Sequence, residues 1–309
     1  ISGDLTKNEE RFALPIMGRV QSIDNAWDVY AMSTYNTITS LAESKIDPNV
    51  LYAGTDDGII QYTKNGGQNW TKMTVDQLPK TPSSAFVNDI KADLFNANTA
   101  YVCLDNHKFG DYQPYLFKTT DGGKSWKSIT NGLPEKILVW RLVQDHINPN
   151  LLFLGTEYGV YVSLNQGQKW HKFSNGLPTI PVRDLTIQRR ENDLVLATFG
   201  RSFYVLDDFS PLRNFSEEKL NKDVLFEPRK ALQYTPMIGG TSSDGGASFK
   251  RKNPAYGATI SYFIKDGFKS LTAQRTKKEN AAGLSDDVLD KLKEAGYTFS
   301  NIKDAEKAE

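Results

Sequence analysis

The chain has 309 residues, of which 37 are Lys or Arg and 37 are Asp or Glu, so its formal net charge at pH 7 is zero. Proteins that wrap nucleic acid or lie on anionic lipid need a basic excess, and this balance argues against both functions. No apolar run approaches the ~20 residues of a membrane span. The single Cys103 can form neither an internal disulfide nor a zinc cluster, so we expect no metal and no cofactor.

The first predicted elements belong to a unit that begins near residue 37. Short strands are expected over 37–41, 51–53 and 59–63, and the turn residues 56–58 between the last two indicate a hairpin. The segment TKNGGQNW follows, in which an Asn side chain can fold onto the next backbone amides and a Gly supplies the positive φ. The tryptophan then begins an outer strand and packs across the sheet.

The same segment returns twice, as TTDGGKSW and SLNQGQKW, and each copy reads Ser/Thr-x-Asp/Asn-x-Gly-x-x-Trp. Four short strands about every 45 residues, with an aromatic residue marking each unit, are typical of a β-propeller. We call these three segments the boxes. The residues predicted to shape them are Thr63, Asn65, Gly67, Trp70, Thr119, Asp121, Gly123, Trp126, Ser163, Asn165, Gly167 and Trp170.

The repeat predicts an all-β chain with about four blades between residues 37 and 235. Inner strands are expected over 37–41, 85–90, 138–143 and 182–187, and we expect a fourth blade without a box over 194–208. The segment 224–234 is predicted to close that blade. Residues 1–36 are expected to form the tail of a preceding blade and its connection, which predicts that the propeller is incomplete.

The amino-acid composition changes after residue 235. Residues 236–252 are rich in Gly and Ser and read as a flexible linker. Residues 253–309 are expected to contain a strand over 258–264 and helices over 271–282 and 285–296. One strand and two helices cannot bury a core of their own, so this segment reads as the truncated start of a further β domain.

The boxes resemble the Asp-box, or bacterial neuraminidase repeat, of sialidases, xyloglucanase-type glycosidases and the sortilin propeller. ISGDLT, GTDDG, YLFKTTDGGKSW, ATFGRSFYVLDDFSPLR and NPAYGATISYFIK are similar to the C-terminal half of bacterial sortilin-like, or "glycosyl hydrolase", repeat proteins. The resemblance covers residues 1 to about 300 and departs from the family pattern at Asn65, Asn165 and Phe199. It implies a truncated β-sandwich-like segment with a helical insertion after the propeller, and a secreted, periplasmic or cell-surface location.

Strand order predicts where a ligand would bind. The turns between second and third strands should all lie at one end of the blades, opposite the boxes. The candidates there are Asp57, Asp105, His107, Asp111, Glu157 and Arg201. Each also has a structural interpretation: Asp57 as turn chemistry, His107 with Asp105 and Asp111 as a hydrogen-bonded loop clamp, and Arg201 as a salt bridge between blades.

We therefore predict a non-catalytic extracytoplasmic propeller that binds a protein, peptide or glycan through the end opposite the boxes. An outer-membrane or cell-surface complex is a further expected partner. One alternative is a glycoside hydrolase, for which Asp56 or Asp57 with Glu157 would have to form the carboxylate pair. The other alternative is a structural subunit of a cell-envelope assembly.

Overall fold

The computed structural model describes residues 2–16, 19–20, 35–231, 233, 235, 256–267, 270, 273–274, 276–277 and 281. The chain divides into two compact units, Ile1–Ser216 and Glu217–Glu309. Among the described residues, the first unit contains four antiparallel sheets of three or four strands and one two-stranded hairpin, and the second contains one small strand pair. Among the helices that the described residues form, none is both long and apolar enough to cross a bilayer.

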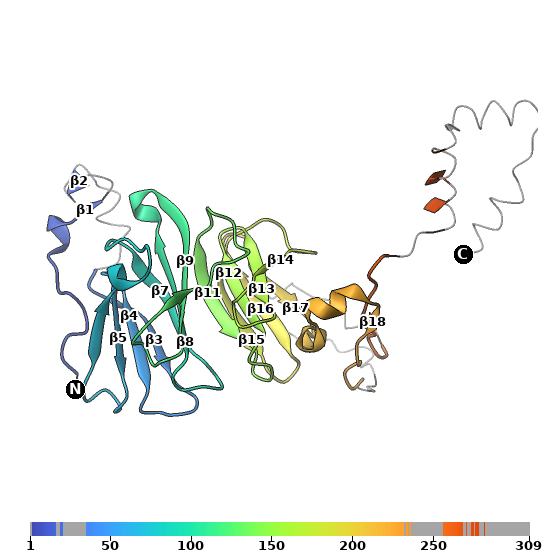
Figure 1. The fold of residues 1–309 in the computed structure, drawn as a ribbon, viewed down its shortest axis with the longest axis horizontal. Helices are drawn as coiled ribbons and strands as arrows, with labels where there is room; N and C mark the ends of the chain where they lie inside the picture. Colours follow the sequence, from blue (N-terminus) through green and yellow to red (C-terminus); the bar gives the residue numbers. More distant parts are fainter. Residues whose placement is uncertain are drawn as a thin grey trace, which may run out of the picture. The chain divides into compact units, whose positions relative to one another are not determined.

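The four sheets of the first unit are the blades of a partial β-propeller (Figure 1). Each blade uses its strands in chain order, from an inner strand to an outer one. Blade 1 contains β3 (Ile38–Glu43), β4 (Leu51–Thr55), β5 (Ile59–Thr63) and β6 (Thr71–Thr74). Blade 2 contains β7 (Phe86–Ala92), β8 (Ala100–Asn106), β9 (Asp111–Thr119) and β10 (Lys127–Ser128). Blade 3 contains β11 (Val139–Gln144), β12 (Leu152–Thr156), β13 (Gly159–Ser163) and β14 (His171–Phe173). Blade 4 contains β15 (Val182–Gln188), β16 (Asp193–Thr198) and β17 (Phe203–Leu206).

Short elements connect and flank the blades. The strands β1 (Pro15–Ile16) and β2 (Arg19–Val20) form a hairpin after the 3₁₀ turn η1 (Arg11–Ala13). Further 3₁₀ turns are η3 (Val75–Gln77), η4 (His107–Phe109), η5 (Ser210–Asn214) and η6 (Glu217–Asn221). In the second unit β18 (Val224–Leu225) pairs with β19 (Tyr262–Phe263).

Consecutive blades pack face to face because alternate side chains of each strand point to opposite faces of its sheet. Three apolar clusters fill the spaces between blades 1 and 2, 2 and 3, and 3 and 4. The inner-strand residues Ile90, Leu142 and Leu185 occupy the same register position and each packs into the preceding blade, at 0%, 1% and 4% exposure. Leu41 holds that position in blade 1 and is 67% exposed. The face of blade 1 that carries Leu41 thus has an apolar residue where the other blades pack against a neighbour. Among the described residues, no further sheet covers this face.

The boxes make the same contacts in all three blades that contain one. The Ser/Thr hydroxyl donates to the Asn or Asp Oδ1 at 2.8, 2.8 and 2.9 Å in boxes one to three. The same hydroxyl accepts the N–H of the box glycine at 3.2, 3.0 and 2.8 Å. The Oδ1 atom accepts the N–H four residues further along at 3.0, 2.9 and 2.9 Å. The tight turn that the sequence predicted is therefore present, with Asn serving as well as Asp because only Oδ1 is needed for these bonds.

Each box tryptophan directly precedes the outer strand of its blade, as predicted. Their burial is unequal. Trp170 is 2% exposed and Trp126 is 7% exposed, whereas Trp70 is only half-buried. Trp170 differs in its polar contact as well, since its Nε1 donates to the Ile129 carbonyl at 2.7 Å. The indoles of Trp126 and Trp170 are thus almost fully covered, whereas that of Trp70 is covered only in part.

Two predicted strands differ from the observed ones, and a predicted linker and two predicted helices lie wholly or largely outside the described residues. The segment 224–234 was expected to close blade 4, but its strand β18 pairs with β19, and blade 4 has three strands among the described residues. The strand expected over 258–264 is limited to the two residues of β19. The linker over 236–252, the helix over 285–296 and much of the helix over 271–282 lie outside the described residues.

Candidate functional site at the end of the blades opposite the boxes

The two ends of each blade carry different turns and connections. The boxes lie against the connections between first and second strands, where Gly66, Gly122 and Gln166 donate their N–H groups to Asn49, Asn98 and Asn150 carbonyls. At the other end, the turns between second and third strands lie against the start of the inner strand, as in the 3.0 Å bond from the Glu157 N–H to the Leu138 carbonyl. We call this second end the rim. The strand order therefore places the candidates predicted from sequence at the rim, opposite the boxes.

Two of the predicted ligand contacts are buried. Asp57 accepts the Thr55 hydroxyl and, at 2.5 Å, the Lys7 N–H, so it closes its own turn and ties down the N-terminal segment. Asp105 is fully buried at the end of β8. It accepts the Asn88 side-chain amide at 3.0 Å and lies 2.5 Å from His107 Nδ1. These two carboxylates position neighbouring groups and do not reach the surface.

The other predicted residues have different positions. His107 lies in η4 with 35% of its side chain exposed, and its Nδ1 points to Asp105. Asp111 begins β9 and accepts the Tyr115 hydroxyl at 2.6 Å and the Gln113 N–H at 3.1 Å, which matches the loop-clamp interpretation. Glu157 accepts the Trp140 Nε1–H at 3.1 Å. Arg201 is exposed in the turn between β16 and β17.

Four further residues of the rim were not predicted from the sequence: Trp140 and Phe86 contact His107, Arg183 lies on Trp140, and Lys108 lies on Phe86. The guanidinium carbon of Arg183 lies 3.6 Å from the centroid of the Trp140 ring, and the His107 ring meets Trp140 edge-on at 6.0 Å between centroids. On the other side of His107, the Phe86 ring lies 6.2 Å away, and the Lys108 ammonium lies 5.1 Å from the Phe86 centroid. We call the continuous set Lys108, Phe86, His107, Trp140 and Arg183 the rim cluster.

A β-bulge in each inner strand explains why the rim cluster forms. The register shifts between Ile38 and Ser40, Val87 and Asp89, Val139 and Arg141, and Val182 and Asp184, so one residue per blade lies out of register at the same position. These bulged residues are Thr39, Asn88, Trp140 and Arg183. Bulges redirect side chains and are common beside functional sites. Here each bulged residue reaches a neighbouring blade: Thr39 donates to the Val87 carbonyl at 2.6 Å, and Asn88 donates to the Val139 carbonyl at 3.0 Å.

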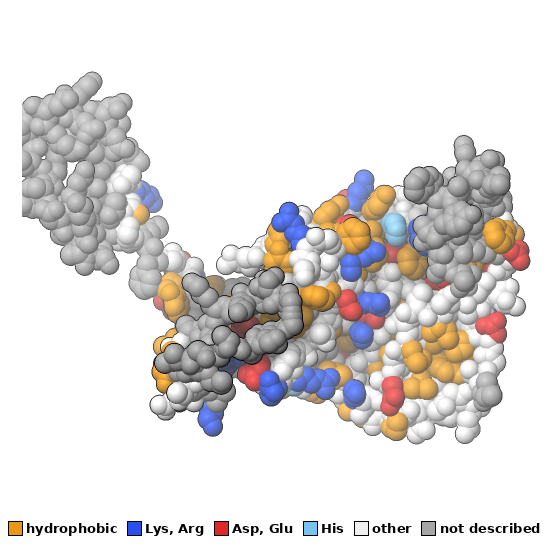
Figure 2. Space-filling model, turned by 180° about the vertical axis from the view of Figure 1, so that it is seen from behind, with side chains coloured by type: hydrophobic (Ala, Val, Ile, Leu, Met, Phe, Trp, Pro, Cys, Tyr) orange, Lys and Arg blue, Asp and Glu red, His pale blue; other side chains and the backbone are white. Residues whose placement is uncertain are grey.

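Among the residues that the structure describes, two of the three basic side chains of the rim cluster, Lys108 and Arg183, are not paired with carboxylates, whereas His107 lies against Asp105. Within the described part of the chain, no ion pair joins Lys108 or Arg183 to an acidic side chain, and both cations lie on aromatic rings instead. The nearby Asp105 and Glu157 are engaged by His107, Asn88 and Trp140. Basic, hydrophobic and histidine side chains lie close together along the upper edge of the molecule in Figure 2. This arrangement can attract a negatively charged group and provide aromatic contact area next to it.

The site offers little to a metal or a covalent reaction. Among the described residues no group of three or more His, Cys, Asp or Glu side chains is arranged to hold a metal ion. Cys103 is buried in β8, and burial raises the pKa of its thiol well above the usual value, which disfavours the reactive thiolate.

No protein-family model matches the chain, and no curated protein matches its sequence. Solved structures with a similar fold include the GH74 enzyme of Niastella koreensis, with 16% identity and a TM-score of 0.42 over 53% of this chain and 26% of that one. YCF48 bound to D1 peptide is 20% identical, with a TM-score of 0.40 over 56% of this chain and 52% of that one. The GH74 xyloglucanase from Xanthomonas campestris is 12% identical, with a TM-score of 0.42 over 56% of this chain and 31% of that one. The chain thus matches about a quarter to a half of the length of these proteins, and similarity at this level carries no argument about its ligand.

Proposed function

We propose that this chain is a non-catalytic β-propeller that binds a protein, peptide or glycan partner through anionic groups of that partner. The observation that carries the proposal is the rim cluster, in which Arg183 stacks on Trp140 at 3.6 Å beside the half-exposed His107. Cations held on aromatic rings keep their charge available to a ligand, and the partly desolvated guanidinium is well suited to pair with a carboxylate or sulfate.

Exposed aromatic side chains around the rim cluster support binding to an extended partner. Phe109 is the last residue of η4, Tyr112 lies at the start of β9, and Tyr158 lies in the turn next to Glu157. Aromatic and Arg side chains dominate the energetics of binding surfaces because they bury large areas while retaining polar contacts. A partner that crosses from blade 2 to blade 3 would contact both of these turns.

The carboxylates favour binding over glycoside hydrolysis. Hydrolysis requires two carboxyl groups that face one bond, about 5 Å or 6.5–9.5 Å apart. Asp57 and Asp105 are buried, so they offer no carboxyl oxygen to a substrate. Asp56, the other candidate for the pair, is half-buried and accepts the Thr37 N–H at 2.7 Å, and Glu157 is hydrogen-bonded to Trp140. We therefore place Glu157 as a positioning residue that fixes the Trp140 ring under Arg183.

We also propose that the chain is an Asp-box protein of the sortilin-like kind that works outside the cytoplasm. The support is the threefold recurrence of one box geometry, including the two boxes in which Asn replaces Asp. Fractionation of the source cells followed by immunoblotting tests the location. Detection in the cytoplasmic fraction alone would contradict this part of the proposal.

The binding function is tested with glycan and peptide arrays that contain acidic members and their neutral counterparts. We compare the wild type with Arg183→Gln and His107→Asn, and Arg190→Gln is the matched control because Arg190 is an exposed arginine paired with Glu191 outside the rim cluster. We expect acidic members to be retained by the wild type and by R190Q, and to be lost or weakened about tenfold in R183Q. Equal retention by R183Q and R190Q, with both variants folded by circular dichroism, would refute rim binding and leave the structural-subunit alternative.

A further inference from the structure

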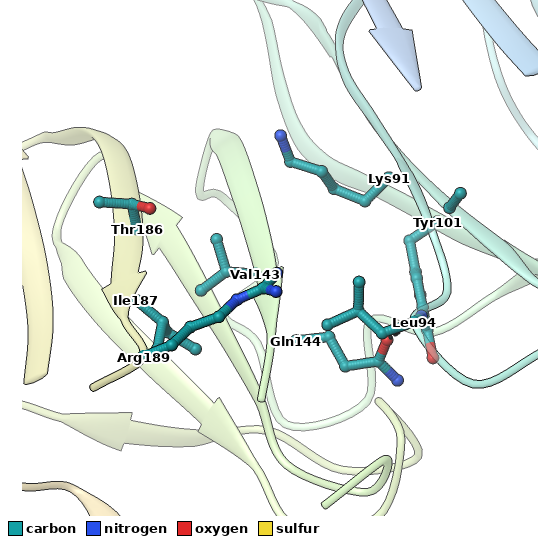
Figure 3. A pocket seen from close by; sticks show the side chains of 9 residues that line it. Lys91, Leu94, Tyr101, Val143, Gln144, Thr186, Ile187 and Arg189 are labelled. Atoms are coloured by element: carbon teal, nitrogen blue, oxygen red, sulfur yellow. Dashed lines mark hydrogen bonds between the residues drawn. The ribbon is translucent and has the colours of Figure 1, made fainter. Parts of the chain in front are cut away.

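A hollow of about 200 Å³ lies at the opposite end of the inner strands from the rim (Figure 3). It is formed where β7, β11 and β15 end side by side, with one residue from the start of β8. Its nine lining residues are Lys91, Ala92, Leu94, Tyr101, Val143, Gln144, Thr186, Ile187 and Arg189. None of them belongs to the rim cluster, so any ligand here binds independently of the proposed function.

The charged side chains that line this hollow are all positive. Lys91 and Arg189 are the two charged residues in its lining, and no carboxylate contributes to it. Lys91 Nζ lies 3.4 Å from Asp89 Oδ1, but Asp89 is buried and also pairs with the Arg141 guanidinium at 3.2 Å. The Arg141 guanidinium also lies 3.9 Å from Asp184, so Asp89 and Asp184 together match Lys91 and Arg141 in charge. The positive excess at the hollow therefore comes from the exposed Arg189, with the exposed Lys91 ammonium beside it.

The wall between the cations is rigid and mainly apolar. Gln144 is held on three sides, since its Oε1 accepts the Leu94 N–H at 2.7 Å and its Nε2 donates to Asp93 at 2.7 Å and to the Pro149 carbonyl at 3.1 Å. The Tyr101 hydroxyl also donates to Asp93, at 3.1 Å. These polar groups are satisfied within the protein. The contacts left for a ligand are the two cations, the Thr186 hydroxyl and the apolar side chains, which Figure 3 shows around the same space.

We propose that this hollow binds an organic monocarboxylate with a small apolar body. The carboxylate pairs with Arg189 and Lys91, while the apolar body lies on Leu94, Val143 and Ile187. The volume sets the size of the ligand, because an apolar cavity of about 150 Å³ is known to hold one benzene ring. A free aromatic or branched acid and the apolar C-terminal residue of a peptide share this chemistry.

The probe is sodium benzoate, titrated into the ¹⁵N-labelled chain and followed by amide chemical shifts. For so small a ligand, we expect a dissociation constant on the order of 1 mM, with the largest shifts at the ends of β7, β11 and β15. Benzamide has the same shape without the charge and is expected to cause no saturable shifts. Equal binding of benzamide, or the absence of saturable benzoate shifts around this hollow, would overturn the proposal.

Charge variants test the assigned contacts. We expect Arg189→Gln and Lys91→Gln each to weaken benzoate binding about five- to tenfold, and Arg189→Lys to restore most of it. Arg190→Gln is the matched control, since it removes the neighbouring positive charge outside the lining. If R190Q weakens binding as much as R189Q, the attraction comes from the overall charge of this surface and the assignment is wrong.

The two ligand sources are distinguished with acetyl-alanyl-leucine and its C-terminal amide. Tighter binding of this acid than of benzoate, with no binding of the amide, would assign the hollow to a peptide C-terminus. Tighter binding of benzoate would assign it to a free acid. Binding of the amide as tight as that of the acid would contradict a carboxylate site.

Discussion

The three box tryptophans provide a graded test of how the blades are held together. All three precede an outer strand, yet Trp170 is 2% exposed, Trp126 is 7% exposed and Trp70 is half-buried. Trp170 lies in the cluster between blades 2 and 3, and its indole N–H is hydrogen-bonded to Ile129. Trp126 lies in the cluster between blades 1 and 2, and no hydrogen-bond partner for its Nε1 is found among the described residues.

The expected costs follow from these differences. Truncation of a buried Trp to Ala removes about 3–5 kcal/mol of stability, and loss of a hydrogen bond adds roughly 1 kcal/mol. We expect Trp170→Ala to cost about 4–5 kcal/mol and Trp126→Ala about 3–4 kcal/mol. Trp70→Ala should cost about 1–2 kcal/mol because less of the side chain is removed from water in the folded state.

The measurement is urea unfolding followed by far-ultraviolet circular dichroism, with the midpoint converted to free energy at a common slope. If Trp170→Ala does not fold, Trp170→Phe against Trp70→Phe gives the same ranking at smaller cost. Equal losses at all three positions, or the largest loss at Trp70, would refute the argument that burial between blades determines the contribution of a box.

Three further predictions concern the same architecture. Hydrogen bonds from the Ser125 hydroxyl and N–H, together with the Thr119 hydroxyl and the Lys124 N–H, lower the pKa of Asp121 to about 2 from 3.8. The contribution of Asp121 to stability is therefore present above pH 3.8 and is lost as the pH falls towards 2. Asp121→Asn should weaken the dependence of the urea midpoint on pH over that range, and a pH dependence equal to that of the wild type would contradict this. Gly123→Ala should destabilise the chain by more than about 1 kcal/mol, because φ at this position is +88° and the new Cβ would lie 2.8 Å from the Tyr62 ring of blade 1. A melting temperature equal to that of the wild type within error would contradict this prediction. Leu142→Ala should cost about 2–5 kcal/mol whereas Leu41→Ala should cost about 0.5 kcal/mol or less, although both hold the same register position; equal urea midpoints would show that the face of blade 1 is packed in solution.

The sequence predicted the blades because each one repeats a local code. Thr119, Asp121 and Gly123 close their turn through bonds within five residues, so the box folds in the same way wherever it occurs. The ends of the four inner strands were predicted to within two residues. Each of these strands repeats the same short pattern, in which a valine or isoleucine is followed three positions later by a second apolar residue.

The rim cluster was harder to predict because it depends on long-range geometry. Trp140 and Arg183 reach the rim through bulges, and a bulge is an irregularity that period-two reading of a strand does not reveal. Aligning the inner strands on their apolar residues would have placed Thr39, Asn88, Trp140 and Arg183 at one position and would have shown an aromatic residue and a cation there. The burial of Asp57 was missed as well, because its partner Lys7 lies 50 residues away in the chain.

The central proposal for this protein is that its rim binds a partner and does not cleave it. The most direct measurement is release of reducing ends from the polysaccharide that the arrays identify, or of new termini from the peptide, at protein concentrations that saturate binding. We predict that the wild type binds this ligand through Arg183 and releases no product over a day. Product release that is abolished by Glu157→Gln and retained by Arg190→Gln would show that the rim is an active site and would contradict the proposed function.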